Sequence, residues 1–269
     1  MRAVVCLKQV VDPLTPATEL ALDRAAKKMK PAAAGPPVIN GYDEQALEAA
    51  LRLRESLGQL EIVALSLGER FHLDVMKRSL AVGADQLVLV QDPSLDTPDS
   101  HRVATALAAA IRKIGAVDLV LCGRQASDWD NAIVPLLLAE LLGMPCLTLA
   151  RRVSVQGARV EIDRVLPDGS QTMWSELPAV VTVTSELGAL RMPTARARLA
   201  TARIQPKLLT LADLGVAAAE PPQVEVRDLS IPVAGRECRF VEAADGAAAG
   251  RRLAEILMEA GVVRPEGAR

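Results

Sequence analysis

The chain has 269 residues, which is enough for one large domain or for one domain with appendages. Half of the residues are hydrophobic but only 2% are aromatic, so the core must be built from Ala, Val, Leu and Ile. This composition favours helices packed on a parallel sheet, whose buried strands are unbroken aliphatic runs. The formal net charge of -2 argues against nucleic acid or an anionic membrane surface as the partner of the whole chain.

Cysteine usage and the N-terminal sequence indicate a cytoplasmic protein. The four cysteines are far apart and fit no zinc-binding spacing, and three of them lie inside aliphatic runs, where a free cysteine behaves as a small buried hydrophobe. Residues 1–11 are typical of a first strand and not of a signal peptide. The most apolar stretch, residues 132–150, contains two prolines, a glycine and a glutamate, which argues against a transmembrane helix.

The first 150 residues alternate between aliphatic runs and helical periodicity. In the first helical segment, Ala46, Ala50, Leu53 and Leu57 recur at spacings of three and four residues. In chain order we expect strands at residues 2–7, 61–67, 86–90, 118–122 and 146–150, and helices at residues 42–57, 71–82, 101–114 and 131–142. A long Pro- and Ala-rich loop is expected at residues 12–38. Right-handed crossovers turn this alternation into a doubly wound, mainly parallel α/β sheet with helices on both faces.

The pattern changes after residue 150. Alternating apolar and polar residues at 152–162, followed by a Pro-Asp-Gly turn, predict an added β-hairpin, and residues 178–184 predict one more central strand. The rest is proline-rich and is expected to form an extended arm that lies against another surface and ends in an amphipathic helix at residues 247–260. We therefore predict an α/β nucleotide-binding domain at residues 1–190 and a partner-binding arm with the C-terminal helix at residues 191–269.

The segment Leu119–Leu136 contains the strongest candidate for a ligand site. A buried strand ends at Gly123, a polar loop follows, and a helix begins near Asn131. In open α/β sheets ligands bind beyond the carboxyl ends of strands, and the free N–H groups of a helix N-terminus suit a phosphate. The alternative is that Asp128, Asp130 and Asn131 only cap the helix. Neither a Walker motif nor a GxGxxG motif is present.

Two further loops follow strands at the same edge of the sheet, after Cys6 and after Leu67. The turn at Asn40–Asp43, which opens a helix, is expected to meet them and to complete an adenosine-sized cleft. Helix capping is an equal alternative for Asn40 and Asp43. Core packing is the better explanation of the Cys6 side chain, and it leaves the backbone of this residue available to an adenine edge.

Independent catalysis has little support in the sequence. His72 and His101 lie in helical patterns beside polar residues and are expected to face solvent, and no GxSxG, HExxH or Cys/His/Asn arrangement is present. Asp128 and Asp130 are two acids without further ligands, which is weak evidence for a metal site. We therefore predict neither catalytic residues nor a bound metal.

The segment at residues 187–212 is basic and contains no acidic residue. A solvated arm is one interpretation, and a surface that meets an acidic partner protein is another. Nucleic acid is a poor candidate because no aromatic residue interleaves with the basic side chains to stack on bases. The basic residues are Arg191, Arg196, Arg198, Arg203 and Lys207.

Six segments occur in an order and at a spacing that are difficult to obtain by chance. They are VVCLKQVVD, INGYDEQALEAALRLRE, SLAVGAD, VDLVLCGRQASDWDNAIVPLLLAELLGMP, ELPAVVTVT and LADLG. The most specific parts are GRQASD, followed by Asp-Asn-Ala and a helix, and the run LPAVVTV after an acid-glycine turn. Together these segments resemble the β subunit of electron transfer flavoproteins over nearly the whole chain.

The resemblance implies an electron carrier and not an independent enzyme. Members of this family pair with an α subunit that holds the redox-active FAD, and the β subunit itself binds AMP or, in bifurcating members, a second FAD. Electrons come from acyl-CoA or other dehydrogenases, as in fatty acid oxidation, and pass to a quinone oxidoreductase. A stand-alone adenine-nucleotide-binding protein or ATP-using enzyme of similar fold is the alternative.

Carried onto this chain residue by residue, the resemblance implies two sets of binding residues. The nucleotide set is Cys6, Asn40, Gly41, Tyr42, Asp43, Leu67, Gly123, Arg124, Gln125, Ala126, Ser127, Asp128, Asn131, Ala132, Ile133 and Val134. The partner set, in the arm, is Met192, Thr194, Ala195, Arg196 and Arg198.

The chain departs from the family pattern in both sets. Ile133 replaces an amide side chain and Pro135 lacks a backbone N–H, so we expect the N–H groups of residues 132–134 to remain as the phosphate donors. Ala195 stands where a leucine is usual. Either docking uses Met192 or Arg196, or the dehydrogenase partner is an unusual one.

Overall fold

The computed structural model describes residues 1–16, 19–25, 27–29, 36–217, 222–231 and 238–263. By the contacts between its residues the chain divides into two compact units, Met1–Leu229 and Ser230–Arg269. The first unit contains the large sheet, and the second contains helix α7 (Gly246–Glu259). The functional division predicted after residue 190 stays a prediction.

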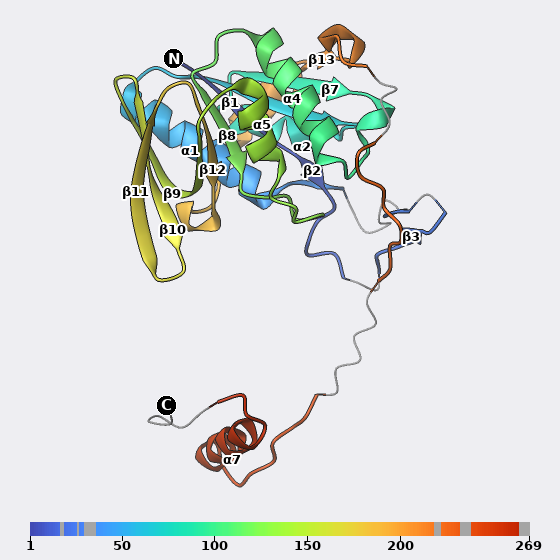
Figure 1. The fold of residues 1–269 in the computed structure, drawn as a ribbon, viewed down its shortest axis with the longest axis vertical. Helices are drawn as coiled ribbons and strands as arrows, with labels where there is room; N and C mark the ends of the chain where they lie inside the picture. Colours follow the sequence, from blue (N-terminus) through green and yellow to red (C-terminus); the bar gives the residue numbers. More distant parts are fainter. Residues whose placement is uncertain (17–18, 26, 30–35, 218–221, 232–237, 264–269) are drawn as a thin grey trace. The chain divides into compact units, whose positions relative to one another are not determined.

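Within the described residues, a nine-stranded sheet organises the first unit, with the strand order β11-β10-β9-β12-β8-β1-β6-β7-β13 (Figure 1). The strands are β1 (Arg2–Cys6), β6 (Glu61–Gly68), β7 (Gln86–Gln91), β8 (Leu119–Gly123), β9 (Cys146–Gln156), β10 (Arg159–Leu166), β11 (Gly169–Glu176), β12 (Ala179–Val183) and β13 (Lys207–Leu209). Neighbouring strands from β9 to β13 are parallel, whereas β10 is antiparallel to both β9 and β11. The predicted doubly wound, mainly parallel α/β sheet is confirmed.

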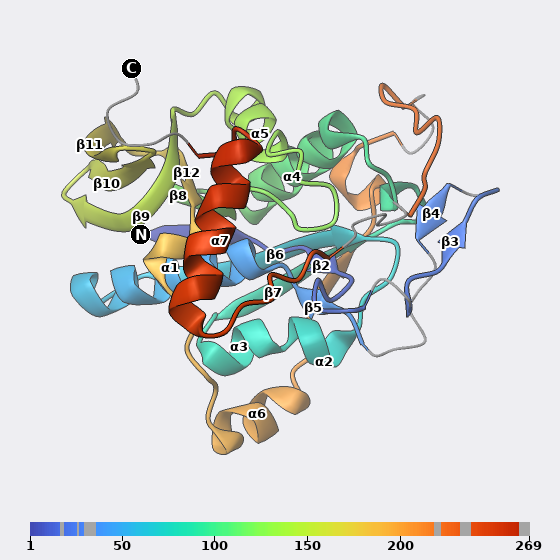
Figure 2. The ribbon, with the colours of Figure 1, turned by 90° about the horizontal axis from the view of Figure 1, so that it is seen from below.

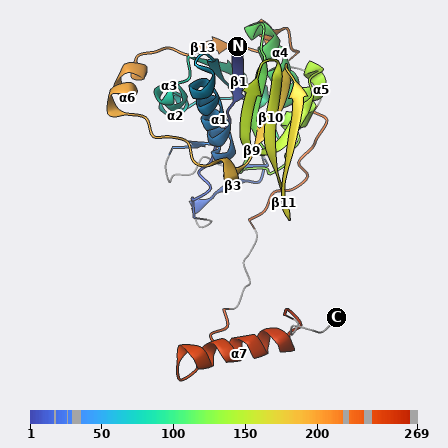
Figure 3. The same ribbon diagram turned by 90° about the vertical axis from the view of Figure 1, so that its left-hand side faces the viewer.

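Helices cover both faces of this sheet (Figure 3). One face carries α1 (Gly41–Leu57), α2 (Leu73–Met76) and α3 (Arg78–Val82), and the other carries α4 (Ser100–Ile114) and α5 (Val134–Leu142). Successive residues of a strand point to opposite faces, so Val5 packs with Leu47 of α1 while Val4 packs with Ile111 of α4. Both clusters are aliphatic, as the composition predicted.

Short elements occupy the region that was predicted as a long loop, part of which lies outside the described residues. Two antiparallel ribbons are formed by β2 (Gln9–Val10) with β5 (Val38–Ile39) and by β3 (Leu22–Asp23) with β4 (Lys28–Met29). Single turns of 3-10 helix lie at Pro93–Leu95, Ser185–Leu187 and Ala212–Leu214.

The order of the strands places a switch point at the carboxyl ends of two central strands. The chain adds β6 and β7 on one side of β1 and then returns to add β8 and β12 on the other side. The direction of winding therefore reverses between β1 and β8, whose carboxyl ends are Cys6 and Gly123. In open α/β sheets, the crevice at such a switch point is where ligands bind.

Two predicted helices have different boundaries in the structure. The helix expected after the second long strand is interrupted at Lys77, whose ψ is -13°, and becomes α2 and α3. The helix expected from Asn131 begins at Val134 instead, because Asp130 and Ala132 have φ of 50° and 55°. Residues in the left-handed region cannot continue a right-handed helix.

The part of the chain beyond residue 150 is more regular than predicted. β9 runs through the expected short strand into the expected hairpin, so β9, β10 and β11 form a three-stranded meander. The arm, which was expected to be extended, contains helix α6 (Ala195–Ala202), and β13 within it pairs with β7. Thr194 caps α6, because its hydroxyl oxygen accepts the N–H of Ala197 at 3.1 Å. Four alanines favour this helix.

The second unit confirms the helix predicted at residues 247–260. α7 is capped by Asp245, whose carboxylate accepts the N–H of Ala248 at 2.7 Å. No residue of α7 is buried, and Leu253, on its predicted apolar stripe, is 47% exposed. Among the helices of the described residues, none is long and apolar enough to cross a membrane.

Candidate functional site

The carboxylate of Asp43, in the first turn of α1, joins the two strand ends at the switch point. Its Oδ2 accepts the backbone N–H of Lys8 at 2.8 Å, just after β1, and its Oδ1 accepts the backbone N–H of Gly123 at 3.0 Å, at the end of β8. Asp43 is only 7% exposed. One side chain therefore fixes the start of a helix against two neighbouring strands.

Asn40 performs a related task from the position that precedes α1. Its Nδ2 donates to the carbonyl of Gln125 at 2.8 Å, and its Oδ1 accepts the N–H of Ser127 at 3.1 Å. Its own N–H donates to the carbonyl of Lys8 at 2.8 Å. Asn40 is fully buried and makes no capping hydrogen bond with its side chain, so the capping alternative is wrong for this residue. It ties the loop after β8 to α1.

Burial has a large effect on the protonation of Asp43. It raises the pKa of Asp43 from 3.8 to about 7, although hydrogen bonds from Lys8, Asn40 and Gly123 act in the opposite direction. The removal of the carboxylate from water therefore outweighs the donors that surround it. Asp43, at the carboxyl ends of β1 and β8, consequently titrates near neutral pH.

Gly123 is the point of closest approach between β8 and α1. A Cβ atom placed on it would lie 2.5 Å from Oδ1 of Asp43 and 2.7 Å from both the backbone carbonyl carbon and the Cβ of Tyr42. The atoms of Tyr42 belong to a helix that is already fixed to the sheet, so they cannot move aside as the end of a flexible side chain would. The close approach of helix and strand therefore requires glycine at this position.

Two side-chain contacts hold the loop that links β8 to α5. Lys8 Nζ donates to Oδ2 of Asp128 at 2.6 Å, and Gln125 Nε2 donates to Oδ1 of Asp130 at 2.8 Å. The residue that precedes α5 is Ile133, which has no side chain that caps the helix. The alternative in which the acids and the asparagine of this loop cap α5 is therefore wrong.

The start of α5 leaves few backbone N–H groups for a ligand. Pro135 has none, and the N–H groups of Leu136 and Leu137 both donate to the carbonyl of Ile133 at 3.1 Å. The N–H groups of residues 132–134 make no hydrogen bond within the described chain. Ala132 has a left-handed backbone, a conformation that gathers successive N–H groups into an anion-binding nest.

Polar atoms without a partner mark the same loop. Ser127 Oγ and Arg124 Nε are buried and have no hydrogen-bond partner within the described residues. The guanidinium carbon of Arg124 lies 4.8 Å from the centre of the Tyr42 ring. Buried polar atoms without partners are uncommon in folded proteins, and these two lie in the loop that follows β8.

Cys6 and Leu67, the other predicted strand-end residues, contribute to the core. Cys6 is 8% exposed. Its thiol forms a hydrogen bond with the Cys122 thiol, and this contact together with burial raises the pKa of Cys122 well above its usual range. Leu67 is partly buried against the same aliphatic cluster. The interpretation of Cys6 as a packing residue is confirmed.

The structure joins part of the predicted nucleotide set by direct contacts. The members linked by hydrogen bonds are Asn40, Asp43, Gly123, Gln125 and Ser127, and Tyr42 pairs with Arg124. Gly41, Ala126, Asn131, Ala132, Ile133 and Val134 lie on the same two segments of chain without side-chain hydrogen bonds to this group. Asp128 is joined to the group through its ion pair with Lys8, and Asp130 through its hydrogen bond with Gln125. The predicted set contained neither Lys8 nor Asp130. Lys8 is the first polar residue after β1, a signal that the sequence already carried.

The two histidines are not part of this arrangement of contacts. His72 precedes α2 and is exposed as predicted, whereas His101, in the first turn of α4, is partly buried. In the part of the chain that the structure describes, no three His, Cys, Asp or Glu side chains gather where they could hold a metal ion.

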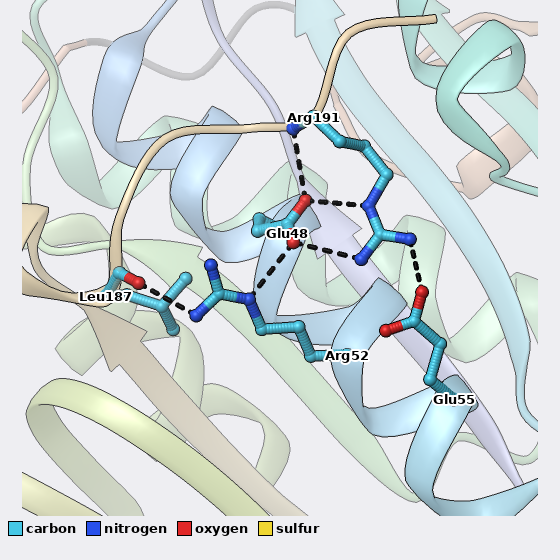
Figure 4. A network of polar contacts seen from close by, with 5 residues as sticks. All are labelled: Glu48, Arg52, Glu55, Leu187 and Arg191. Carbon is cyan, nitrogen blue, oxygen red and sulfur yellow. Dashed lines mark hydrogen bonds and ion pairs between the residues drawn. The ribbon is translucent and has the colours of Figure 1, made fainter.

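A second polar cluster fixes the beginning of the arm (Figure 4). Glu48 of α1 is 4% exposed, and its carboxylate accepts hydrogen bonds from the backbone N–H, Nε and Nη2 of Arg191 at 2.9–3.1 Å. Arg52 donates from Nε to the same carboxylate at 3.0 Å and from Nη1 to the carbonyl of Leu187 at 2.9 Å. Arg191 also pairs with Glu55.

The charges in this cluster stabilise one another. Burial tends to raise the pKa of Glu48, but the hydrogen bonds from Arg191 and Arg52 outweigh it and hold the pKa below its ordinary value. The hydrogen bonds from Glu48 and Glu55 raise the pKa of Arg191. Loss of one member would leave an ionised partner in a partly buried position, which is costly.

The cluster holds the chain at Arg191, just before α6 begins at Ala195. In Figures 2 and 3, α6 lies beyond α3, with which it is in contact, on the side away from the sheet. At the other end of the helix, Lys77 Nζ donates to the carbonyl of Ala202 at 2.7 Å. The predicted partner residues Met192, Thr194, Ala195, Arg196 and Arg198 are all exposed. The predicted set omitted Leu199, which is 76% exposed, because only the helix reveals its outward direction.

Comparison with known proteins gives a consistent result. Residues 17–212 match the family model described as electron transfer flavoprotein domain. The electron transfer flavoprotein subunit beta of Megasphaera elsdenii is 34% identical over 231 residues, 83% of this chain and 82% of its own length. The subunit of the same name from Thermoanaerobacterium thermosaccharolyticum is 34% identical over 217 residues, 80% of this chain and 81% of its length. The caffeyl-CoA reductase-Etf complex subunit CarD of Acetobacterium woodii is 33% identical over 187 residues, 70% of each chain.

Replacement of Gly123 tests the close approach of α1 to β8. Gly123→Ala places a methyl group against Asp43 and Tyr42, and we expect it to lower the free energy of unfolding by about 1–3 kcal/mol. The measurement is urea unfolding followed by circular dichroism. Gly169→Ala is the matched control, because a Cβ there meets nothing within 4 Å, and we expect a change within about 0.5 kcal/mol. Equal stabilities of the two variants would contradict the argument.

The raised pKa of Asp43 predicts a pH dependence of stability. The folded state holds a proton that the unfolded state releases, so the free energy of unfolding falls as the pH rises from about 4 to about 7. The full effect is about 4 kcal/mol. Asp43→Asn lacks this titration but keeps all other groups, so the stability difference, wild type minus variant, should decrease over the same range. A difference that is constant between pH 4.5 and 7.5 would rule out the raised pKa.

Loss of Glu48 should release the arm. Glu48→Ala leaves Arg191 without its main partner, and we expect a loss of about 1–3 kcal/mol in unfolding free energy together with faster trypsin cleavage after the arginines of α6. Glu55→Ala is the control, because this exposed residue makes a single contact with Arg191 and should leave both readouts near wild type. Similar cleavage rates in the two variants would show that Glu48 does not hold the arm.

Proposed function

The chain belongs to the electron transfer flavoprotein family as a relative of its β subunits, and we propose that it carries electrons as the β half of a heterodimer. The observation that supports this most strongly is the match to the family over residues 17–212, which span most of the predicted nucleotide set and the predicted partner set. The α subunit would hold the redox-active FAD. Electrons would enter from acyl-CoA or other dehydrogenases and leave to a quinone oxidoreductase.

We further propose that the loop between β8 and α5, at the switch point, binds a nucleotide, either AMP or a second FAD. A second FAD would supply redox chemistry here, whereas AMP would stabilise the fold without reacting. The backbone N–H groups of residues 132–134 would hold the phosphate. Ser127 Oγ and Arg124 Nε, which have no hydrogen-bond partner within the described residues, would donate to the ligand. Asn40 and Asp43 would act indirectly, by fixing the loop and the strand ends around the ligand.

The departures from the family pattern reduce the number of groups in this loop that could bind a phosphate. Ile133 is 46% exposed at the start of α5, so it offers an apolar contact where an amide could have donated. Pro135 removes one backbone donor from the first turn of this helix. Phosphate binding would therefore depend on the left-handed turn before the helix more than on the helix itself.

The arm supplies the proposed contact with other proteins. Met192, Thr194, Ala195, Arg196 and Arg198 would meet the electron-donating dehydrogenase, and residues 191–269 as a whole would bind partner proteins. The relative from Acetobacterium woodii is a subunit of a caffeyl-CoA reductase-Etf complex, which supports a partner that acts on CoA thioesters. Because this part of the arm is exposed and positively charged, we expect the surface of the partner protein to carry acidic residues.

Identification of the bound cofactors tests the proposal directly. We expect co-expression with the cognate α subunit to give a yellow heterodimer, which on denaturation releases FAD and a nucleotide that mass spectrometry identifies as AMP or as additional FAD. Failure to associate with any α subunit would disprove the electron-transfer role. An associated heterodimer that releases only one FAD would disprove the second nucleotide site.

Ser127→Ala provides a matched test of the loop. Ser127 Oγ has no protein partner, so its loss should leave the thermal unfolding of the nucleotide-free chain unchanged. Loss of one hydrogen bond to the ligand should weaken nucleotide binding by about 2- to 10-fold, measured by calorimetric titration. Unchanged nucleotide affinity would exclude the serine from the site.

A further inference from the structure

Two of the four cysteines lie at the ends of neighbouring strands, at the switch point. Cys6 is the last residue of β1, and Cys122 is the last but one of β8. The two strands are parallel neighbours in the sheet, with Val5 paired to Leu121 (Figure 1). The next pair along them is Cys6 and Cys122, and both side chains lie on the face that carries α4 and α5. Their thiols are therefore direct neighbours, in agreement with the hydrogen bond between them.

The spacing of the strands suits a disulfide between these two cysteines. Neighbouring strands lie about 4.8 Å apart, and the Cα atoms of bonded cysteines are usually about 4.4–6.8 Å apart. The two side chains also point to the same face of the sheet. A bond between them therefore requires no rearrangement of the sheet.

Among the described residues, the other two cysteines form no comparable pair. Cys146 begins β9, and β12 lies between β9 and β8, so the backbone of Cys146 is two strand spacings away from that of Cys122. Cys238 is exposed and belongs to the second unit. Cys6 and Cys122 are 8% and 4% exposed, which keeps large reagents away from them. The oxidant that suits this pair is therefore a small molecule, hydrogen peroxide.

The two thiols have different roles in the oxidation. The pKa of Cys122 is raised, so its thiol keeps the proton and donates the hydrogen bond to the sulfur of Cys6. Cys6, the more exposed of the two, reacts first as the thiolate. Its sulfur attacks one oxygen of the peroxide, the O–O bond breaks, and a sulfenic acid and one water form. The sulfur of Cys122 then displaces the hydroxyl group, which leaves with the thiol proton as a second water.

The loop between β8 and α5 is connected to both cysteines. Gly123 follows one of them and leads into the loop, whereas Lys8 lies two residues after the other and is paired with Asp128 in the loop. From α1, on the opposite face of the sheet, Asp43 holds the backbone N–H groups of Lys8 and Gly123. A covalent S–S bond is shorter than a hydrogen bond between two thiols, so oxidation draws the strand ends together on one face only. The loop must then change its position.

We infer that Cys6 and Cys122 form a peroxide-sensitive pair, and that its oxidation to a disulfide weakens the binding of a nucleotide at the adjoining loop. The modification site depends only on the position of the two thiols. Its effect on binding rests on the proposed function. In reducing compartments, protein disulfides are mainly transient redox sensors, and a bond that a thiol reductant reverses fits this use.

Mapping of the disulfide tests the modification site. The full chain with Cys238→Ala, which removes the exposed thiol, is treated with hydrogen peroxide at a concentration that fully oxidises Cys238 of the wild type. We expect the mass of the chain to fall by about 2 Da, and its tryptic peptides to be linked through Cys6 and Cys122 until dithiothreitol separates them. Cys146→Ala in the same background is the matched control and should give the same linked peptides. Recovery of Cys6 and Cys122 on separate peptides, or linkage of either to Cys146, would overturn the site.

Calorimetric titration with AMP tests the effect on binding. We expect the oxidised chain to bind AMP about 5- to 50-fold more weakly than the reduced chain, and dithiothreitol to restore the affinity. Cys122→Ala cannot form the bond, so the same treatment should lower its affinity less, with circular dichroism as the check that this variant is folded. An equal loss of affinity in this variant would assign the effect to Cys6 alone and overturn the role of the disulfide.

The outcomes separate this inference from the proposed function. If the disulfide forms and the oxidised and reduced chains bind AMP equally well, the effect on the loop is overturned while the proposed function stands. If the reduced chain binds neither AMP nor FAD, the proposed nucleotide site fails and the effect on binding fails with it. The linked peptides decide the modification site in either case.

Discussion

The carboxylate of Asp43 connects two strand ends and one helix start, and the arrangement of the switch point depends on this connection. Each of its oxygens accepts a backbone N–H from a different strand end, at Lys8 and at Gly123. The helix start can lie this close only because residue 123 has no side chain. Asn40 then ties the loop after β8 to the same helix start. The unfavourable burial of a carboxylate is thus tolerated where it fixes two strand ends and a helix start together.

Helix α1 also connects the carboxyl ends of β1 and β8 to the beginning of the arm. Its first turn carries Asp43, and the following turns carry Glu48 and Glu55, which bind Arg191 at the beginning of the arm. A single helix of 17 residues therefore positions both the proposed nucleotide loop and the beginning of the proposed partner-binding arm. Its aliphatic inner face, which includes the fully buried Leu47, holds it against the sheet. The two surfaces are consequently fixed relative to each other by ordinary core packing.

Prediction from the sequence succeeded where local pattern decides structure and failed where distant contacts decide it. The aliphatic strands and the periodic helix α1 were placed correctly because hydrophobic periodicity is a local property. The start of α5 was misplaced because alanine at position 132 gives no sign of a left-handed backbone. The loop before it is held by Lys8, which is 120 residues away from Asp128. The order in the arm was underestimated because prolines concealed the alanine-rich stretch that forms α6.

The sequence by itself determined the aliphatic core, the mainly parallel sheet and the family, because composition, periodicity and ordered motifs are properties of the linear chain. The tertiary structure alone decided the partners of individual polar side chains. Asn40 has the residue type of a helix cap, yet its amide binds a loop 85 residues further on. Glu48 looks like a surface acid of α1, yet it is buried by Arg191, which lies 143 residues away in sequence. Such pairs form only when packing brings distant segments together, so no local pattern encodes them.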